Sequence, residues 1–282
     1  MARPKWFIKL LKKSFGLRFF LARLVKIPGL KYIANKLFFD DDVVFYLPRD
    51  NIITENKSVV RKIKVDEKIA QLEDLVIPSK IIEKFIDEAK YLWIMNFCLC
   101  RESNKCESYP KELGCLFLGE AVQNIDPDFG SLVTKQEAKD HIKKCADAGL
   151  FHLIGKNKID TQWLDIRPGE KLLTICNCCE CCCLWKMLPN LPVKISRNIT
   201  KLPGIKIEVL EHCSGCGVCA ENICFVNAIK MKDNFAVIDQ ELCRGCVKCV
   251  ENCPENAIQL TIENEEYINQ TIKRIKEVVS VD

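Results

Sequence analysis

Two cysteine blocks near the carboxyl end decide the fold: 213-CSGCGVCAENIC-224 and 243-CRGCVKCVENC-253. Each block places three cysteines at every third position and a fourth a few residues later. Three thiolates on a tight loop, with a fourth just before a helix, reach the corners of one iron-sulfur cubane. Eight cysteines that only filled a core would not repeat in register, and a disulfide framework is not expected where thiols stay reduced. The pattern therefore predicts eight ligands for two iron-sulfur clusters.

The two blocks also match beyond their cysteines, because 224-CFVNAI-229 aligns with 253-CPENAI-258. The repeated unit is a cysteine loop, a short helix and a strand. Residues 205–210 and 258–262 show the alternation of a first and a last strand. On these residues, the stretch from about 206 to 263 resembles the bacterial-type two-cluster 4Fe-4S ferredoxins.

The resemblance implies a crossed set of ligands, since in that family the fourth cysteine of each block binds the other cluster. The first cluster would then have Cys213, Cys216, Cys219 and Cys253, and the second Cys224, Cys243, Cys246 and Cys249. The chain departs from the family pattern in the first block, where four residues instead of three precede Cys224 and Phe225 replaces the usual proline. We expect the extra residue to tilt a helix turn or shift a cluster potential without removing a ligand.

Ten further cysteines form two groups upstream. Cys98, Cys100, Cys106 and Cys115 share an 18-residue window, and Cys176, Cys178, Cys179, Cys181, Cys182 and Cys183 lie within eight positions. Thiols this close together oxidise or take up metal, whereas bound iron or zinc stabilises the thiolates. The spacing leaves the ligand subset open. We expect at least one additional metal site here, an iron-sulfur cluster, with a structural zinc site or a thiol redox centre as alternatives.

The surroundings of these ten cysteines also carry resemblances. Residues 96–101, 114–119 and 174–179 are similar to an uncharacterised cysteine-rich region found ahead of ferredoxin domains in anaerobes. No activity is assigned to that region, so the similarity does not point to one. The adjacent pair Cys178-Cys179 is similar to the cysteine-rich domains of heterodisulfide reductases, although the long-range spacing differs.

Three residues outside the two groups have separate interpretations. A helix is predicted from Ser79 to the next cysteines, and a second over 133–149, with a capping box between Thr134 and Glu137. Cys145 is alone in the second helix, and we expect it to be a small buried residue. His152 is expected in the core, and His212 is a candidate to tune a cluster because it adjoins Cys213.

The amino-terminal 39 residues differ in charge from the rest of the chain. They contain ten Lys or Arg residues and no acid, while the remainder has 32 basic and 38 acidic residues. At 100° per residue the basic side chains gather on one face and apolar ones such as Trp6 and Leu10 on the other. Gly16 is expected to divide the segment and Pro28 to end it. No apolar run reaches the roughly 20 residues that cross a bilayer. These features predict a helix in the membrane interface, with packing on the protein's own body as the alternative.

The predicted fold class is α+β: a mainly helical cysteine-rich domain followed by a small duplicated two-cluster ferredoxin domain. The predicted organisation is a basic amphipathic helical segment (1–39), a connecting region (40–75), the cysteine-rich domain (76–188), a linker (189–204), the ferredoxin domain (205–263) and a carboxyl-terminal helix (264–282). The apolar side chains of that helix form one stripe, which is expected to pack against the rest of the protein.

The predicted function is iron-sulfur electron transfer of the polyferredoxin type, as a carrier or a subunit rather than a stand-alone enzyme. No phosphate-binding glycine loop or serine triad occurs, so nucleotide-dependent and hydrolytic activities have no support. The expected partners are a redox protein and the membrane surface through residues 1–30, with no nucleic acid, in the cytoplasm at the inner face of the membrane. The alternatives are an oxidoreductase whose upstream module reduces a disulfide or small molecule, and a transient metal or cluster donor.

Overall fold

A seven-stranded sheet is the central element of the computed structural model, which describes residues 4–50, 53, 59–61, 77–264 and 266–282. The strand order is β5-β3-β4-β7-β6-β1-β8, and all neighbouring strands are antiparallel except β1 and β8. The strands are β1 (Val43–Leu47), β3 (Leu92–Met95), β4 (Leu116–Leu118), β5 (Gly130–Leu132), β6 (Phe151–Lys156), β7 (Leu173–Cys178) and β8 (Ile199–Lys201). The inner strands β6 and β7 are buried along most of their length, as expected for a sheet covered on both faces.

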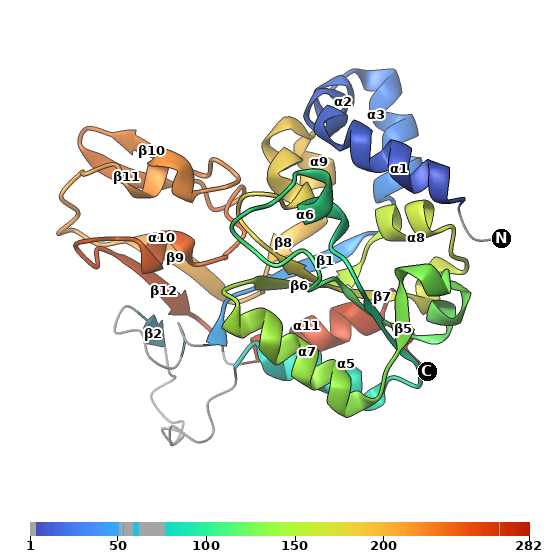
Figure 1. The fold of residues 1–282 in the computed structure, drawn as a ribbon. Coiled ribbons are helices and arrows are strands. Elements are labelled where there is room, and N and C mark those ends of the chain that lie inside the picture. Colours follow the sequence, from blue (N-terminus) through green and yellow to red (C-terminus); the bar gives the residue numbers. More distant parts are fainter. Residues whose placement is uncertain (1–3, 51–52, 54–58, 62–76, 265) are drawn as a thin grey trace.

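Helices cover both faces of this sheet (Figure 1). One face packs against α5 (Ser79–Glu88), α7 (Lys135–Asp147) and α11 (Tyr267–Lys276). The other carries α1 (Lys5–Ser14), α2 (Arg18–Leu24), α6 (Leu99–Ser103), α8 (Lys158–Leu164) and α9 (Val193–Ser196). The remaining helical segments are η1 (Phe15–Leu17), α3 (Pro28–Ala34), η2 (Asn35–Phe39), η4 (Glu120–Asn124), η5 (Pro127–Phe129), η6 (Gly169–Lys171) and η7 (Leu184–Asn190). The alternation of β1 places Phe45 on the α5 face and Tyr46 on the opposite one.

The cysteine repeat forms a smaller unit at one end of the sheet (Figure 1). Its first strand β9 (Ile205–Val209) pairs antiparallel with its last strand β12 (Ile258–Ile262), which also pairs with β2 (Val59–Arg61). Between them lie the hairpin of β10 (Ile229–Lys232) and β11 (Phe235–Ile238), and α10 (Lys248–Glu251). The two terminal strands are confirmed.

The extra residue of the first block is accommodated by a π-helical turn. Residues Cys219–Ile223 form this turn, η8, whereas the matching segment of the second block is the α-helical turn α10. A π-turn holds one more residue than an α-turn, so it absorbs an insertion without displacing the chain that follows. The chain returns to the regular repeat at Cys224.

The two units share one core. It joins side chains of the sheet, of α11 and of the repeat, including Phe45, Ile175, Ile205, Leu260 and Tyr267. Residues 189–204, predicted as a linker, contain α9 and the sheet strand β8, and both Ile195 and Ile199 are fully buried. This segment packs as part of the fold because its apolar side chains face the sheet.

Several sequence predictions are corrected or confirmed by these elements. The α+β class is confirmed, but the sheet within the cysteine-rich region was not foreseen. The helix that begins at Ser79 ends at Glu88 and gives way to β3, so it does not run to the next cysteines. The helix at 133–149 is α7, and its capping box between Thr134 and Glu137 is present. Pro28 begins α3 rather than ending the amino-terminal helices, because proline fits a first helical turn.

Candidate metal centres

The first cavity in the cysteine repeat is lined by Cys213, Cys216, Cys219 and Cys253, together with apolar residues of the hairpin. The loop that carries three of these cysteines depends on Gly215. This glycine has a φ of +71°, and a Cβ there would lie 2.2 Å from the carbonyl oxygen of Asn234. The close approach of the two backbones therefore fixes the loop around the cavity.

The second cavity is lined by Cys224, Cys243, Cys246 and Cys249. Gly245 lies in its loop with a φ of +63° and donates its N–H to Cys243 Sγ at 3.4 Å. Burial raises the pKa of Cys246 to about 12. A thiol with this pKa stays protonated at neutral pH unless a cation binds it.

Matching backbone contacts relate the two cavities. The Ala228 N–H donates to Cys224 Sγ, and the Ala257 N–H donates to Cys253 Sγ, both at 3.2 Å. Asn227 and Asn256 both have left-handed backbone angles, with φ of 53° and 50°. Amide donors to sulfur stabilise thiolate ligands and tune the cluster they hold. The inserted residue therefore leaves the backbone contacts of Cys224 equivalent to those of Cys253.

A buried arginine lies beside the second cavity. Arg244 is 2% exposed and donates to the carbonyl oxygens of Glu241, Leu242 and Ser196 at 2.8, 2.6 and 3.0 Å. Burial lowers its pKa, and the nearby Tyr46, Cys243, Asp239 and Cys224 oppose that shift. The guanidinium thus places a positive charge next to the thiols without an ion pair to a carboxylate among the described residues.

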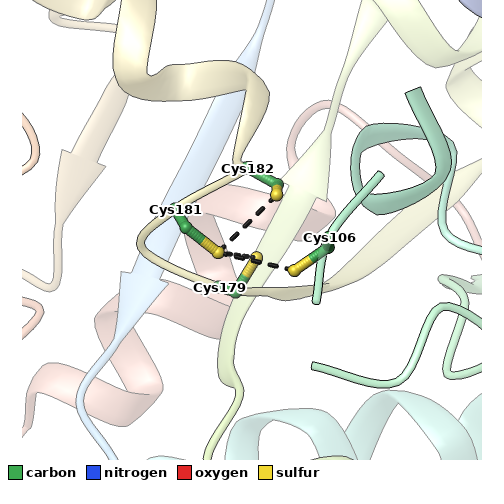
Figure 2. A group of neighbouring side chains, drawn as sticks. All are labelled: Cys106, Cys179, Cys181 and Cys182. Carbon is green, nitrogen blue, oxygen red and sulfur yellow. Dashed lines mark hydrogen bonds between the residues drawn. The ribbon is translucent and has the colours of Figure 1, made fainter. Parts of the chain in front are cut away.

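Four upstream cysteines converge on one point (Figure 2). The sulfur atoms of Cys106, Cys179, Cys181 and Cys182 all lie within 4.8 Å of one another, and we call these residues the four-thiol group. Cys181 Sγ lies 3.6, 3.3 and 3.6 Å from the sulfurs of Cys106, Cys179 and Cys182. Three members come from the loop that follows β7, and Cys106 follows α6. Four thiols at this separation suit a metal ion or cluster.

The other six upstream cysteines lie close to the four-thiol group but face different neighbours. Cys115 directly precedes β4, and its sulfur lies 3.8 Å from that of Cys176 on β7. A hydrogen bond with Cys100 lowers the pKa of Cys98 to about 7. Cys178 and Cys183 pack with Tyr46 and Trp185, on the α2 side of the sheet. All ten candidate cysteines therefore gather at one end of β7, although they are far apart in sequence.

The remaining candidates are structural in character. Cys145 is fully buried, with its sulfur 3.6 Å from His141 Nε2, as expected for a small core residue. His152 is buried with Nδ1 2.8 Å from Asn177 Oδ1, and burial lowers its pKa to about 4, so it stays neutral. His212 is exposed beside Cys213.

Comparison with known proteins identifies part of this architecture. Residues 236–259 match the family model of the 4Fe-4S binding domain. The cysteine repeat carries a 4Fe-4S binding domain. A curated relative is a subunit of the ion-translocating oxidoreductase complex of Methanosarcina acetivorans, which is 38% identical over 66 residues.

The match to that relative has a limited extent. It covers 23% of this chain and 25% of the relative, so the chain spans about a quarter of the length of the curated protein it matches. No solved structure matches the chain. Within the described part of the chain, no helix is both long and apolar enough to cross a membrane.

Proposed function

We propose that this protein carries two 4Fe-4S clusters in the cysteine repeat and transfers single electrons between them and other centres. The observation that carries the proposal is the pair of cavities, each lined by four cysteines. In each cavity three cysteines come from one block and the fourth from the other, which agrees with the crossed ligands that the ferredoxin resemblance implies. The 4Fe-4S domain match over 236–259 supports the chemistry of the donor set.

The chain's own residues prepare these sites for electron transfer. Iron-sulfur clusters supply a centre that gains and loses one electron with little change of geometry. The Ala228 and Ala257 amides and the Gly245 N–H bond to the sulfurs and hold the thiolates in place. The charge of Arg244 favours the more negative, reduced state of whatever the second cavity holds.

We further propose that the four-thiol group binds a third centre. Its four sulfurs are within 4.8 Å of one another, and Cys181 is exposed at the surface. Burial raises the pKa of Cys182 to about 12, so without a cation this buried thiol stays neutral and is a weak donor. A bound cation stabilises the thiolates. An iron-sulfur cluster suits a site adjoining an electron-transfer unit better than zinc does.

Three aromatic rings lie between the second cavity and the upstream cysteines. Tyr46, Phe151 and Phe225 form a closed triangle with ring centroids 5.7, 5.4 and 6.0 Å apart. Phe225 follows Cys224 directly, and Tyr46 Oη lies 3.9 Å from Cys183 Sγ. Phe225, which replaces the family's proline, thus contacts Tyr46, and Tyr46 reaches the upstream thiols. The rings provide a short, dry route for electrons between the two regions.

The amino-terminal segment supports association with a membrane surface. Ile8, Phe15 and Ala22 are buried against the body of the protein, whereas Trp6 and Phe20 are 66% and 59% exposed. Other exposed apolar residues of the segment are Leu10, Leu17, Leu21, Ile27, Leu30, Tyr32, Ile33, Leu37 and Phe38. An apolar surface of this size among basic side chains suits anionic lipid headgroups and acyl chains. The relative's place in an oxidoreductase complex supports a redox partner protein for this chain.

Anaerobic purification tests the proposed function. Iron and acid-labile sulfide are measured per chain, and the reduced protein is examined by electron paramagnetic resonance. About eight irons are expected for the two cavities of the repeat, and about twelve or more with an upstream centre. Colourless protein with less than about one iron per chain would refute the proposal.

A further inference from the structure

Six upstream thiols form a group of their own beside the four-thiol group. We call Cys98, Cys100, Cys115, Cys176, Cys178 and Cys183 the six-thiol group. The thiols of Cys98 and Cys100 lie near enough to change each other's pKa, and the thiol of Cys178 lies equally near those of Cys176 and Cys183. Cys115 adds a further contact to Cys176 at 3.8 Å. Cys98, Cys178 and Cys183 are less than 10% exposed. The six residues come from three stretches of the chain, 98–100, 115 and 176–183, which the fold brings together.

Alternation along the chain separates the two groups. Cys176 and Cys178 lie two residues apart on β7 and therefore share a face of the sheet. Cys178 and Cys183 belong to the apolar cluster around Tyr46 and Trp185, whereas Cys179 and Cys182 pack with Cys106, Cys145 and Leu150. Cys100 also packs against this second cluster, so the two groups adjoin there. Adjacent cysteines thus face two different sets of neighbours. Ten thiols also exceed the four that one zinc ion or one cubane takes.

Two buried arginines adjoin the six-thiol group. Arg101 is fully buried, and its guanidinium donates to the carbonyl oxygens of Pro110 and Asn177 at 2.7 Å each and to that of Leu113. Arg18 of α2 is 9% exposed; its Nη1 donates to the Phe15 carbonyl at 2.9 Å, and its Nε has no partner. In the described part of the chain, neither arginine forms an ion pair with a carboxylate.

These guanidinium groups require negative charge nearby. A buried cation without a counter-charge is strongly unfavourable, so buried arginines are normally paired. The groups that interact electrostatically with Arg101 are Cys98, Cys179, Cys178 and Cys115, and those for Arg18 are Cys100, Cys183 and Cys182. Arg18 also stacks on the rings of Phe15 and Phe19, with its Cζ 4.2 Å from each centroid. The nearby groups that can add negative charge are these cysteines, as thiolates. Several buried thiolates at this spacing repel one another, and a bound metal centre offsets the repulsion.

We infer that the six-thiol group binds an iron-sulfur cluster of its own, distinct from the centre of the four-thiol group. Six thiols exceed the four that one zinc ion or one cubane takes, which points to a polynuclear centre. Arg244 beside the second cavity of the repeat shows the same combination of a buried guanidinium and converging cysteines. The inference rests on the proposed function, because it assumes that the protein acquires iron-sulfur clusters.

Paired cysteine variants of the full chain separate the sites. Cys176→Ala/Cys178→Ala removes two members of the six-thiol group, and Cys179→Ala/Cys182→Ala removes two members of the four-thiol group. Cys145→Ala, a buried cysteine outside both groups, is the matched control. Iron, zinc and sulfide are counted after anaerobic purification, and Mössbauer spectra are recorded. Each paired variant is expected to lose a different spectral component, and the control is expected to lose none.

The outcomes distinguish this inference from the proposed function. Loss of the same component in both paired variants, wild-type iron in Cys176→Ala/Cys178→Ala, or zinc in place of iron would overturn the inference while the ferredoxin signals persist. Absence of ferredoxin signals in the wild type would instead refute the proposed function.

Arg18→Gln offers a test that leaves every thiol in place. It removes a positive charge, so the reduction potential of the six-thiol centre is expected to fall at unchanged iron content. Arg23→Gln, an exposed position on the same helix, is the control. Equal potentials in the two variants would contradict the inference.

Discussion

Buried arginines accompany cysteines in both halves of the molecule. Arg244 adjoins the second cavity of the repeat, and Arg101 and Arg18 adjoin the upstream thiols. Each guanidinium donates to backbone carbonyls, and among the described residues none forms an ion pair with a carboxylate. At the scale of single residues, positive charge is built into the core beside the cysteines.

The crossed ligands can be tested at single residues. Cys253→Ser is expected to remove the cluster of the first cavity and leave that of the second, because a serine oxygen is a poor replacement for a thiolate. If Cys253 shares a site with Cys216, then Cys216→Ser loses the same electron paramagnetic resonance signal, and the double variant loses nothing more. A larger loss in the double variant would contradict the shared site.

Asp42 gives a prediction on pH dependence. It is 3% exposed; Oδ1 accepts the Lys158 N–H at 2.7 Å, and Oδ2 has no partner. Burial, with a contribution from Asp160, raises its pKa to about 8. The folded state therefore binds a proton that the unfolded state releases near pH 4, and stability falls as pH rises between these values, by at most about 1.4 kcal/mol per pH unit.

Asp42→Asn is expected to remove this pH dependence, because its amide oxygen still accepts the Lys158 N–H. Anaerobic urea unfolding at pH 5 and pH 8 measures the effect, with Asp40→Asn as the control. The variant should exceed the wild type in free energy of unfolding at pH 8, with a much smaller difference at pH 5. An equal difference at both values would count against protonation of Asp42.

At the scale of elements, Phe225 joins the cysteine repeat to the sheet. Its ring is 8% exposed and packs against Tyr46 of β1 and Phe151 of β6. Phe225→Ala is expected to lower the free energy of unfolding by about 3 kcal/mol, as for other buried phenylalanines. Phe225→Leu should cost less, and both variants should keep the iron of the repeat.

Phe225→Ala also tests the electron route. Freeze-quench electron paramagnetic resonance should show slower electron exchange between the repeat and the upstream centres in Phe225→Ala than in the wild type. Phe235→Ala, a partly exposed ring on β11, is the matched control. Unchanged exchange in Phe225→Ala would remove the aromatic triangle from the route.

The elements that the sequence predicted well are those with strong local signals. The capping box at Thr134 and Glu137 located α7, and the alternation at 205–210 and 258–262 located β9 and β12. The large sheet escaped prediction because β4 and β5 have only three residues each and carry little periodicity. The ten upstream cysteines were all predicted as candidates, but their division into groups depends on pairings between distant strands, which no local spacing encodes.

At the scale of the whole molecule, the chain is interleaved rather than arranged as successive domains. It passes from the sheet into the cysteine repeat and returns through α11, which packs against α5 and β1. The ion pair between Arg49 and Glu251 links the end of β1 to α10. Movement of the repeat relative to the upstream thiols would disrupt this shared core, so the separations between the proposed centres are fixed by the fold.

The amino-terminal helices carry a surface on which exposed apolar side chains lie among basic ones. They are anchored by Ile8, Phe15 and Ala22, so deletion of the whole segment would expose the core. Point substitutions on the exposed side avoid this difficulty. Sedimentation with vesicles of phosphatidylcholine, with and without phosphatidylglycerol, is the measurement. Wild-type protein should bind the anionic vesicles, and less so at high salt, because screening weakens the attraction of the basic side chains.

Trp6→Ser/Leu10→Ser is expected to weaken vesicle binding at least tenfold, because each side chain that leaves the acyl region costs about 1.5 kcal/mol or more. Val237→Ser is the control: it is an exposed apolar residue on the hairpin of the repeat, 47% exposed. Equal binding by Trp6→Ser/Leu10→Ser and this control would show that the apolar face does not enter the bilayer. Equal binding to vesicles with and without phosphatidylglycerol would show that charge plays no part. If the wild type binds the vesicles and Trp6→Ser/Leu10→Ser does not, the upstream thiols lie near the membrane. Arg18, on α2 of the same amino-terminal segment, interacts with Cys100 and Cys183.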